Sequence, residues 1–464
     1  MMNRLRKTPL LLLAAAVFFT GCVRSVPVIT DPSAPMTPVG SYDTEEIKIY
    51  TDEGIIEEPL AEYSSDDGLC VIKVMPSYYD ITLDYESGTR AEVGTAYGSL
   101  VRQELPDFIS TMEPYLYENI RSAYGGTYSA EAVEGRIDIL FSSMRPEYQE
   151  EISAFAEAIS GGVHGITEDS SLSYEEAVLM QMIPDALRPT SCSALTLWGD
   201  RTETGDMITL RNLEWNLGSS NQMGMINAVT HMKNGDRSMT AISVLGLLDI
   251  ISAVNDDGVF AAILDVGSIE GEAYVCEGRK CYTMELRYAL EEYSAAREVG
   301  EFMVGESGDF TWCHNLTITD GTDAFCAEDC TDQVAESGIG HSVLRDADTP
   351  IFAGLSWDST DSLCIVNSFT SEGNQDGFTG RDSNVIRFAK YNEWVLETDQ
   401  FSVADVKDMI TQETVDQYAV QNVHSNGSAQ LIIIDYATGS VQVAFSGPDG
   451  VEDKPDFIEV CHIG

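Results

Sequence analysis

A change in apolar periodicity near residue 190 constrains the fold of this 464-residue chain more than any other feature. From about 69 to 189, apolar residues recur mostly at the spacing of amphipathic helices. The clearest helix is predicted over 147–160, and its apolar face consists of Tyr148, Ile152, Phe155, Ala156 and Ile159. Beyond Thr190, short apolar runs alternate with polar turns, as in antiparallel strands. Helices followed by strand runs predict a layered α+β architecture.

The same patterns place individual elements along the chain. Further helices are predicted over 91–109, 173–182, 284–303 and 385–396. Strands are predicted over 193–198, 207–213, 225–231, 239–245 and 258–264, and hairpins over 316–327 and 431–444.

The first 21 residues predict a lipoprotein signal peptide. Basic residues precede an apolar run over 9–19, which is too short to span a bilayer comfortably. The run ends in Thr20-Gly21-Cys22, which resembles a bacterial lipobox in which Cys22 is acylated and becomes the first mature residue. A plain signal peptide is the alternative. We expect an extracytoplasmic protein that is lipid-anchored to the bacterial cell membrane.

The segment 22–68 predicts a flexible tether between the membrane and the fold. It is rich in Pro, Ser, Asp and Glu and has little apolar periodicity, so it cannot bury enough surface to offset its ordering entropy. The folded part is expected to begin near Leu69 and to continue to the C-terminus.

The formal net charge is −50, from 76 acidic and 26 basic residues. A field of this sign repels phosphate backbones, so nucleic acid is excluded as a partner. Because the acidic residues are spread along the chain, a solvated surface explains them better than a site for a cationic substrate.

Ten cysteines are present. Apart from Cys22 and Cys192, the cysteines form an even set, namely Cys70, Cys276, Cys281, Cys313, Cys326, Cys330, Cys364 and Cys461. An oxidising compartment would favour disulfides among them, although the connectivity does not follow from the sequence. If 311–319 and 324–330 form a hairpin, Cys313 faces Cys330. The spacings do not suit zinc, and we predict neither a metal nor a cofactor.

Cys192 opens an apolar strand at the junction of the two halves. The next predicted strand carries Arg211 and Glu214, which lie 19 and 22 residues later, so a hairpin could return both to the beginning of the first strand. A cation near a thiol favours the reactive thiolate, and a carboxylate could orient an amine. A histidine is not required, because a free α-amine can serve as the base.

Several segments together resemble the N-terminal-nucleophile hydrolases of the penicillin acyltransferase and choloylglycine hydrolase kind, with acid ceramidase as a more distant relative. The matching segments are 91–98, 146–152, 154–162, Cys192-Ser193-Ala194, 211–215, 255–259, 365–369 and 383–388. Each is weak alone, and their shared order and spacing make the resemblance specific.

The resemblance implies a four-layer αββα sandwich with a helical N-terminal segment, made as a precursor. It implies autocatalytic cleavage between Ser191 and Cys192, which separates the light-chain segment 69–191 from the catalytic heavy chain 192–464. The new α-amine of Cys192 would be the base for its own thiol.

The roles of the remaining site residues are carried over from the same resemblance. Arg211 would stabilise the thiolate and Glu214 would contact the new amine. Asn367 would donate to the oxyanion, and Arg387 would support the site electrostatically.

Two positions depart from the family pattern. Glu214 stands where relatives carry Asp, so its carboxylate reaches one methylene further. The second asparagine on the oxyanion side falls on Asp265, whose ionised side chain would repel the developing charge. Either a main-chain N–H takes over that role, or the alignment is displaced at this point.

The leading hypothesis is a cysteine amidohydrolase or acyltransferase that cleaves small linear N-acyl amides through an acyl-thioester. The sequence does not separate hydrolysis from transfer. One alternative is a papain-like thiol hydrolase that pairs Cys192 with His424, although the residues typical of a papain-type cysteine are missing. The other is a non-catalytic surface lipoprotein that retains the fold.

Overall fold

The computed structural model describes residues 48–50, 55–187, 190–266, 269, 274–374, 382–415 and 422–463. The predicted signal peptide (1–21) and the lipidation residue Cys22 lie outside these residues, as does most of the predicted tether. Within the described ranges, no helix combines the length and the apolar character that a membrane crossing needs.

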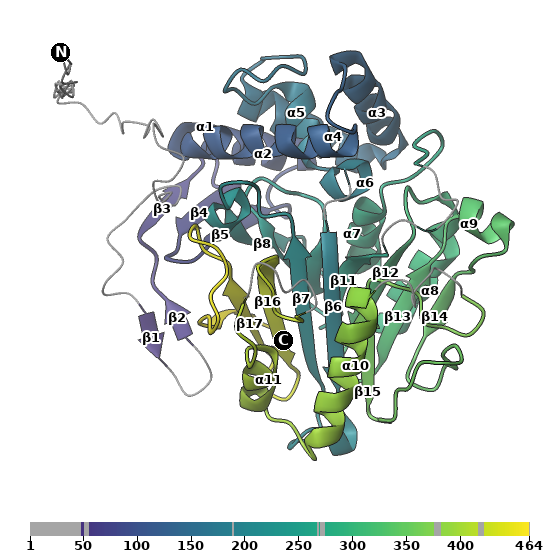
Figure 1. Ribbon diagram of the computed structural model, residues 1–464. Coiled ribbons are helices and arrows are strands. Elements are labelled where there is room, and N and C mark those ends of the chain that lie inside the picture. The colour runs from purple at the N-terminus through teal and green to yellow at the C-terminus, as the bar shows by residue number, and fades with distance from the viewer. Residues whose placement is uncertain are drawn as a thin grey trace, which may run out of the picture. The chain divides into compact units, whose positions relative to one another are not determined.

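Two β-sheets form the centre of the fold (Figure 1). In the described residues, the eight-stranded sheet has the order β1 (Lys48–Tyr50), β2 (Ile55–Glu57), β18 (Ile458–His462), β17 (Ser440–Phe445), β16 (Ser428–Asp435), β7 (Ile208–Trp215), β6 (Thr190–Leu197) and β15 (Ser362–Val366). The ten-stranded sheet has the order β14 (Val343–Arg345), β13 (Ala324–Asp329), β12 (His314–Thr319), β11 (Phe260–Asp265), β10 (Ser252–Asn255), β9 (Met239–Val244), β8 (Asn227–Lys233), β5 (Tyr79–Asp84), β4 (Cys70–Val74) and β3 (Ala61–Ser64). Neighbouring strands are antiparallel except for the β2–β18 and β5–β8 pairs.

The two sheets pack face to face, and β16 shows how. Ile432 and Ile434 share a buried cluster with Val229 and Ile242 of the other sheet. The alternate residues of β16 belong to a second cluster, which contains side chains of helices α10 (Asp382–Glu397) and α11 (Val403–Ile410). Both faces of the strand are therefore buried, and its sequence is almost continuously apolar for this reason.

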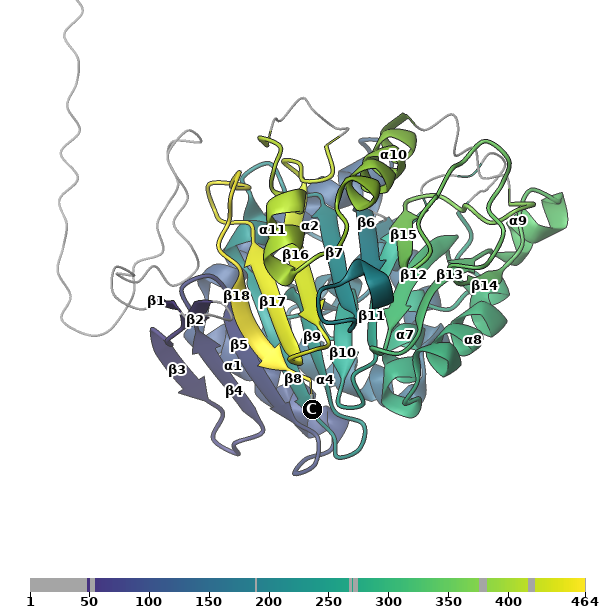
Figure 2. The ribbon, with the colours of Figure 1, turned by 90° about the horizontal axis from the view of Figure 1, so that it is seen from below.

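The other helices lie with the ten-stranded sheet. Their bounds are α1 (Arg90–Glu104), α2 (Asp107–Ala123), α3 (Ala130–Ser143), α4 (Pro146–Ser160), α5 (Tyr174–Met180), α6 (Ile183–Leu187), α7 (Tyr282–Glu292), α8 (Ala296–Glu306) and α9 (Asp332–Ser337). Side chains of α1, α4 and α7 share the largest core cluster with β4, β5 and β8. The layers follow one another as helices, sheet, sheet and helices (Figure 2), which confirms the predicted α+β αββα sandwich.

The N-terminal part contains strands that the composition did not indicate. β1, β2 and β3 fall inside the predicted tether, and the segment 69–187 begins with the β4–β5 hairpin before its helices. In β4 and β5, buried residues alternate with partly exposed ones, a period of two that the mixed polar and apolar composition conceals. The parallel β5–β8 pairing joins this hairpin to the rest of the ten-stranded sheet.

The helix predicted over 284–303 is wrong in one respect, because the structure divides it into α7 and α8. Two side chains from other parts of the fold cap the helix ends at this break. Asn255 Nδ2 donates to the main-chain oxygens of Leu290 and Tyr293 at the end of α7. Asp320 accepts from the main-chain nitrogen of Ala296 at the start of α8. The caps satisfy backbone groups that a continuous helix would have paired internally.

The hairpin predicted around Gly321 is confirmed by the pairing of β12 with β13, which sets His314 opposite Asp329. Cys313 directly precedes His314, and Cys330 directly follows Asp329; both cysteine side chains contact Thr331. All nine cysteines in the described part of the chain are free, so the expected disulfides are not formed there.

Candidate active site

Cys192 lies near the start of β6, between β7 and β15. It is paired with Leu213 of β7, and its side chain is completely buried. Ala194 is paired with Arg211, so Cys192 and Arg211 project from the same face of the sheet. That face is turned toward the other sheet, because Arg211 Nη2 donates to the main-chain oxygen of Ile263 in β11 at 2.9 Å.

The thiol of Cys192 has two polar neighbours. Arg211 Nη2 lies 3.3 Å from Sγ, and Sγ lies 3.9 Å from the main-chain oxygen of Glu214. Burial raises the pKa of the Cys192 thiol above its ordinary value, and the Arg211 guanidinium opposes this effect. Burial likewise lowers the pKa of Arg211. In the continuous chain the protonated thiol is therefore favoured, with a cation in place to stabilise the thiolate.

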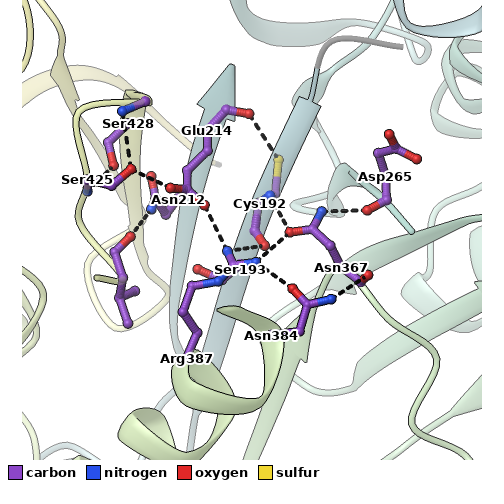
Figure 3. A network of polar contacts seen from close by, with 12 residues as sticks. Cys192, Ser193, Asn212, Glu214, Asp265, Asn367, Asn384, Arg387, Ser425 and Ser428 are labelled. Carbon is purple, nitrogen blue, oxygen red and sulfur yellow. Dashed lines mark hydrogen bonds and ion pairs between the residues drawn. The ribbon is translucent and has the colours of Figure 1, made fainter. Parts of the chain in front are cut away.

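The backbone of Cys192 is held on both sides of its Cα atom. Its nitrogen donates to Asn367 Oδ1 at 2.6 Å, and its carbonyl oxygen accepts from Arg387 Nη1 at 2.9 Å. Asn367 directly follows β15, which pairs Val366 with Ser193 and so brings Asn367 beside Cys192. Asn367 Nδ2 donates to the main-chain oxygen of Asp265 at 2.5 Å (Figure 3).

Arg387, on α10, is the centre of the network. Besides its bond to Cys192, the guanidinium donates to Glu214 Oε2 at 2.8 Å, to Asn367 Oδ1 at 2.9 Å and to Asn384 Oδ1 at 2.7 Å. Its side chain is fully buried. The planar group therefore links β6, β7 and the end of β15 through three directed hydrogen bonds, and the fourth joins it to Asn384 of the same helix.

Glu214 projects from the opposite face of β7 to Arg211. Its carboxylate accepts from Arg387 and from Ser425 Oγ. Burial raises the pKa of Glu214, and Arg387 opposes this effect. Arg387 donates both to this carboxylate and to the carbonyl oxygen of Cys192, so it bridges Glu214 and the main chain of Cys192 (Figure 3).

The structure thus brings together five of the residues singled out from the sequence, namely Cys192, Arg211, Glu214, Asn367 and Arg387. Asp265 also adjoins them, but through its main-chain oxygen. Figure 3 shows its carboxylate turned away from the sulfur of Cys192. Ser191 is paired with Glu214 in the β6–β7 hairpin, so the bond between residues 191 and 192 lies inside a strand.

Sequence reasoning missed three polar residues of this network. Asn384 Nδ2 donates to Asn367 O and to Ser368 Oγ. It lies three residues before Arg387 on α10, but one residue before the helix predicted over 385–396, so the helical spacing was hidden at the sequence level. Asn315 donates to the main chain on both sides of Asn367. Ser425 lies in a loop and had no sequence signal.

His424 does not contact the thiol. Its Nε2 lies 2.8 Å from the main-chain oxygen of Glu452, and burial lowers its pKa. In the part of the chain that the structure describes, no histidine forms a hydrogen bond with Cys192, and no group of three or more His, Cys, Asp or Glu side chains is arranged to hold a metal ion.

No protein-family model matches the sequence, and no curated protein matches it. Solved structures with a similar fold are known. An ortholog of N-acylethanolamine-hydrolyzing acid amidase from Caenorhabditis elegans has 10% identity and a TM-score of 0.36, over 52% of this chain and 92% of its own.

Two bacterial structures are similar to the same extent. A mutant of the conjugated bile acid hydrolase from Clostridium perfringens has 11% identity and a TM-score of 0.34, over 59% of this chain and 100% of its own. Penicillin V acylase from Agrobacterium tumefaciens has 13% identity and a TM-score of 0.33, over 55% of this chain and 83% of its own. Similarity at this level concerns the fold and not the activity.

Proposed function

We propose that this protein is an N-terminal-nucleophile cysteine amidohydrolase, which cleaves itself before Cys192 and then cleaves linear N-acyl amides. One observation carries the proposal. The thiol and the main-chain nitrogen of the same residue lie in one buried polar network, which contains a cation beside the sulfur and an amide oxygen beside the nitrogen. A nucleophile whose base is its own α-amine requires this combination and needs no histidine.

The first reaction is self-cleavage. Cys192 Sγ adds to the carbonyl carbon of Ser191, which closes a five-membered ring, and the thiol proton passes to the Cys192 nitrogen as the C–N bond breaks. The product is a thioester between the Ser191 acyl group and Sγ. Water then hydrolyses it to the Ser191 carboxylate and a free thiol, and Cys192 is left with an α-amine.

The second reaction is turnover. The α-amine, whose ordinary pKa is about 7.7–8, takes the thiol proton as Sγ adds to the substrate carbonyl. It returns that proton to the leaving amine, and an acyl-thioester remains on Cys192. Attack by water completes hydrolysis, and attack by a second amine would complete acyl transfer.

The surrounding residues supply positioning and electrostatics. Arg211 stabilises the thiolate from 3.3 Å. Asn367 orients the nitrogen through Oδ1, and its amide nitrogen Nδ2, which donates to Asp265 O, is assigned as the donor to the oxyanion. Glu214 holds Arg387 and orients the α-amine through it. Asp265 acts through its main-chain oxygen, which removes the conflict between an ionised carboxylate and a developing oxyanion.

The substrate class we propose is a small, linear N-acyl amide. We further propose that the protein is exported and anchored through a lipid on Cys22, so it would meet such amides outside the cytoplasm. Cys22→Ala should then move the protein from the membrane fraction to the soluble fraction without loss of turnover.

Denaturing electrophoresis with N-terminal sequencing tests the mechanism. We expect two fragments from the wild-type chain, one of which begins at Cys192, and turnover of members of an N-acyl amide library. Cys192→Ala should stay whole and inert, and Cys192→Ser should cut slowly. Cys364→Ala, which changes another buried free cysteine in the adjacent strand β15, is the matched control and should cut normally.

Other outcomes identify the alternatives. A whole chain with thiol-dependent turnover that His424→Ala abolishes would indicate a papain-like enzyme. A whole chain that is insensitive to thiol reagents and inert toward the library would indicate a non-catalytic lipoprotein.

A further inference from the structure

Asn367 follows the last residue of β15, and its main chain is held by another buried amide. Asn315 of β12, on the other sheet, directs Nδ2 at the two carbonyl oxygens that flank Asn367. It donates to Val366 O at 2.9 Å and to Ser368 O at 2.9 Å. Asn315 is 1% exposed, so water does not compete for these bonds. Both hydrogens of one amide nitrogen are therefore used to fix the segment around Asn367.

The neighbouring strand of the ten-stranded sheet, β11, holds the side chain of Asn367. In the pairing of β11 with β12, Asn315 lies opposite Leu264, and Asp265 is the next residue. Asp265 O accepts from Asn367 Nδ2. Two neighbouring strands thus hold both the main chain and the side chain of Asn367, and Oδ1 is left to accept from the Cys192 nitrogen and from Arg387.

We propose that Asn315 is a positioning residue for the reaction at Cys192. It acts across the interface between the sheets by setting the place and orientation of Asn367, which in turn sets the main-chain nitrogen of Cys192 and the direction of the oxyanion donor. This inference rests on the proposed function. Asn315 does not contact Cys192, so its effect is on the geometry of the reaction and not on binding of the substrate.

A purely structural role predicts a different result, and Asn255 provides the matched control. Asn255 is another buried asparagine whose Nδ2 donates to two main-chain oxygens, those of Leu290 and Tyr293. Asn315→Asp and Asn255→Asp remove the same pair of donors and introduce the same carboxyl group. Both variants should lose comparable thermal stability, and only Asn315→Asp should change the chemistry.

The experiment measures the self-cleavage half-time, kcat and KM of wild type, Asn315→Asp and Asn255→Asp, with circular dichroism to normalise for the folded fraction. Misplacement of a reacting group costs on the order of 10²-fold in rate. We expect this loss in the self-cleavage rate and kcat of Asn315→Asp, with KM within about twofold of wild type. Asn255→Asp should react like wild type once normalised.

If Asn315→Asp does not fold, Asn315→Ser is the second variant, because its hydroxyl group keeps one donor. We expect Asn315→Ser to show an intermediate loss of the self-cleavage rate and of kcat. Equal rates for the Asn315 and Asn255 variants, or a loss confined to KM, would overturn the positioning role. A wild-type chain that neither cuts nor turns over would instead overturn the proposed function, so the two failures are distinguishable.

Discussion

Replacement of Arg387 by lysine should distinguish the effect of the hydrogen bonds that Arg387 donates from the effect of its positive charge. Lysine keeps the positive charge and can still contact Glu214, but its compact ammonium cannot reproduce the planar fork. The bonds to Asn367 Oδ1 and Asn384 Oδ1, at 2.9 and 2.7 Å, are the ones we expect to be lost.

The magnitude follows from these two bonds. Hydrogen bonds to a charged group contribute about 1.5–3 kcal/mol each, so Arg387→Lys should lower the free energy of unfolding by about 3–6 kcal/mol. Without the Arg387 bond, Asn367 Oδ1 loses one of the donors that orient its side chain, and the donor to the oxyanion is displaced. Loss of one such donor costs on the order of 10²–10³ in rate, which we expect for both self-cleavage and turnover.

Unfolding is best measured in urea by tryptophan fluorescence, with Cys192→Ala as the background, so that a single uncut chain unfolds. Rates are then measured with Cys192 restored. Arg287→Lys is the control, because Arg287 is also fully buried and pairs with Glu151 and Glu291 at a distance from the thiol. It should lose similar stability and keep its rates. Arg387→Lys that reacts within about twofold of wild type would refute the assignment of Arg387 to the reaction geometry.

Three further predictions concern stability and the histidine alternative. Burial raises the pKa of Asp185 to about 6, above its ordinary value, so below pH 6 the folded state binds a proton that the unfolded state binds only at lower pH. The stability of wild type relative to Asp185→Asn should therefore increase by up to about 3 kcal/mol as the pH falls from 7 to 4. A difference in urea unfolding that does not depend on pH would contradict this. A Cβ on Gly94 would lie 2.4 Å from the main-chain oxygen of Glu151, whereas one on Gly135 meets nothing within 4 Å. Gly94→Ala should therefore lower the free energy of unfolding by about 1–3 kcal/mol, and Gly135→Ala, also in a helix, should raise it by about 0.5–1 kcal/mol; equal shifts of the two urea midpoints would count against the close packing of α1 on α4. His424→Ala should destabilise the fold by about 1–3 kcal/mol, because the bond to Glu452 O is lost, and should leave self-cleavage and turnover of the folded protein unchanged.

Spacing along the chain placed only the parts of the site that are joined by a short connection, whereas Asn367 and Arg387 were assigned from the family resemblance. The β6–β7 hairpin has eight residue pairs, and it brings Arg211 and Glu214 back to the beginning of β6. Alternation along the two strands then decides which residues share the face of Cys192. The helix α4 was predictable for the same reason, because its apolar spacing and its terminal residues lie within one short stretch.

Contacts between distant segments were decided by the tertiary structure alone. Asn367 reaches the nitrogen of Cys192 across 175 residues of sequence because β15 pairs with β6, and no local pattern indicates which strand becomes that neighbour. Asn315 acts from the opposite sheet, and the break between α7 and α8 depends on side chains from β10 and from the turn after β12. The periodicity of apolar residues indicates which face of a helix or strand is buried, because each buried position along the element favours an apolar residue. Which element covers that face depends on long-range register and on the meeting of two sheets, which only the folded chain specifies.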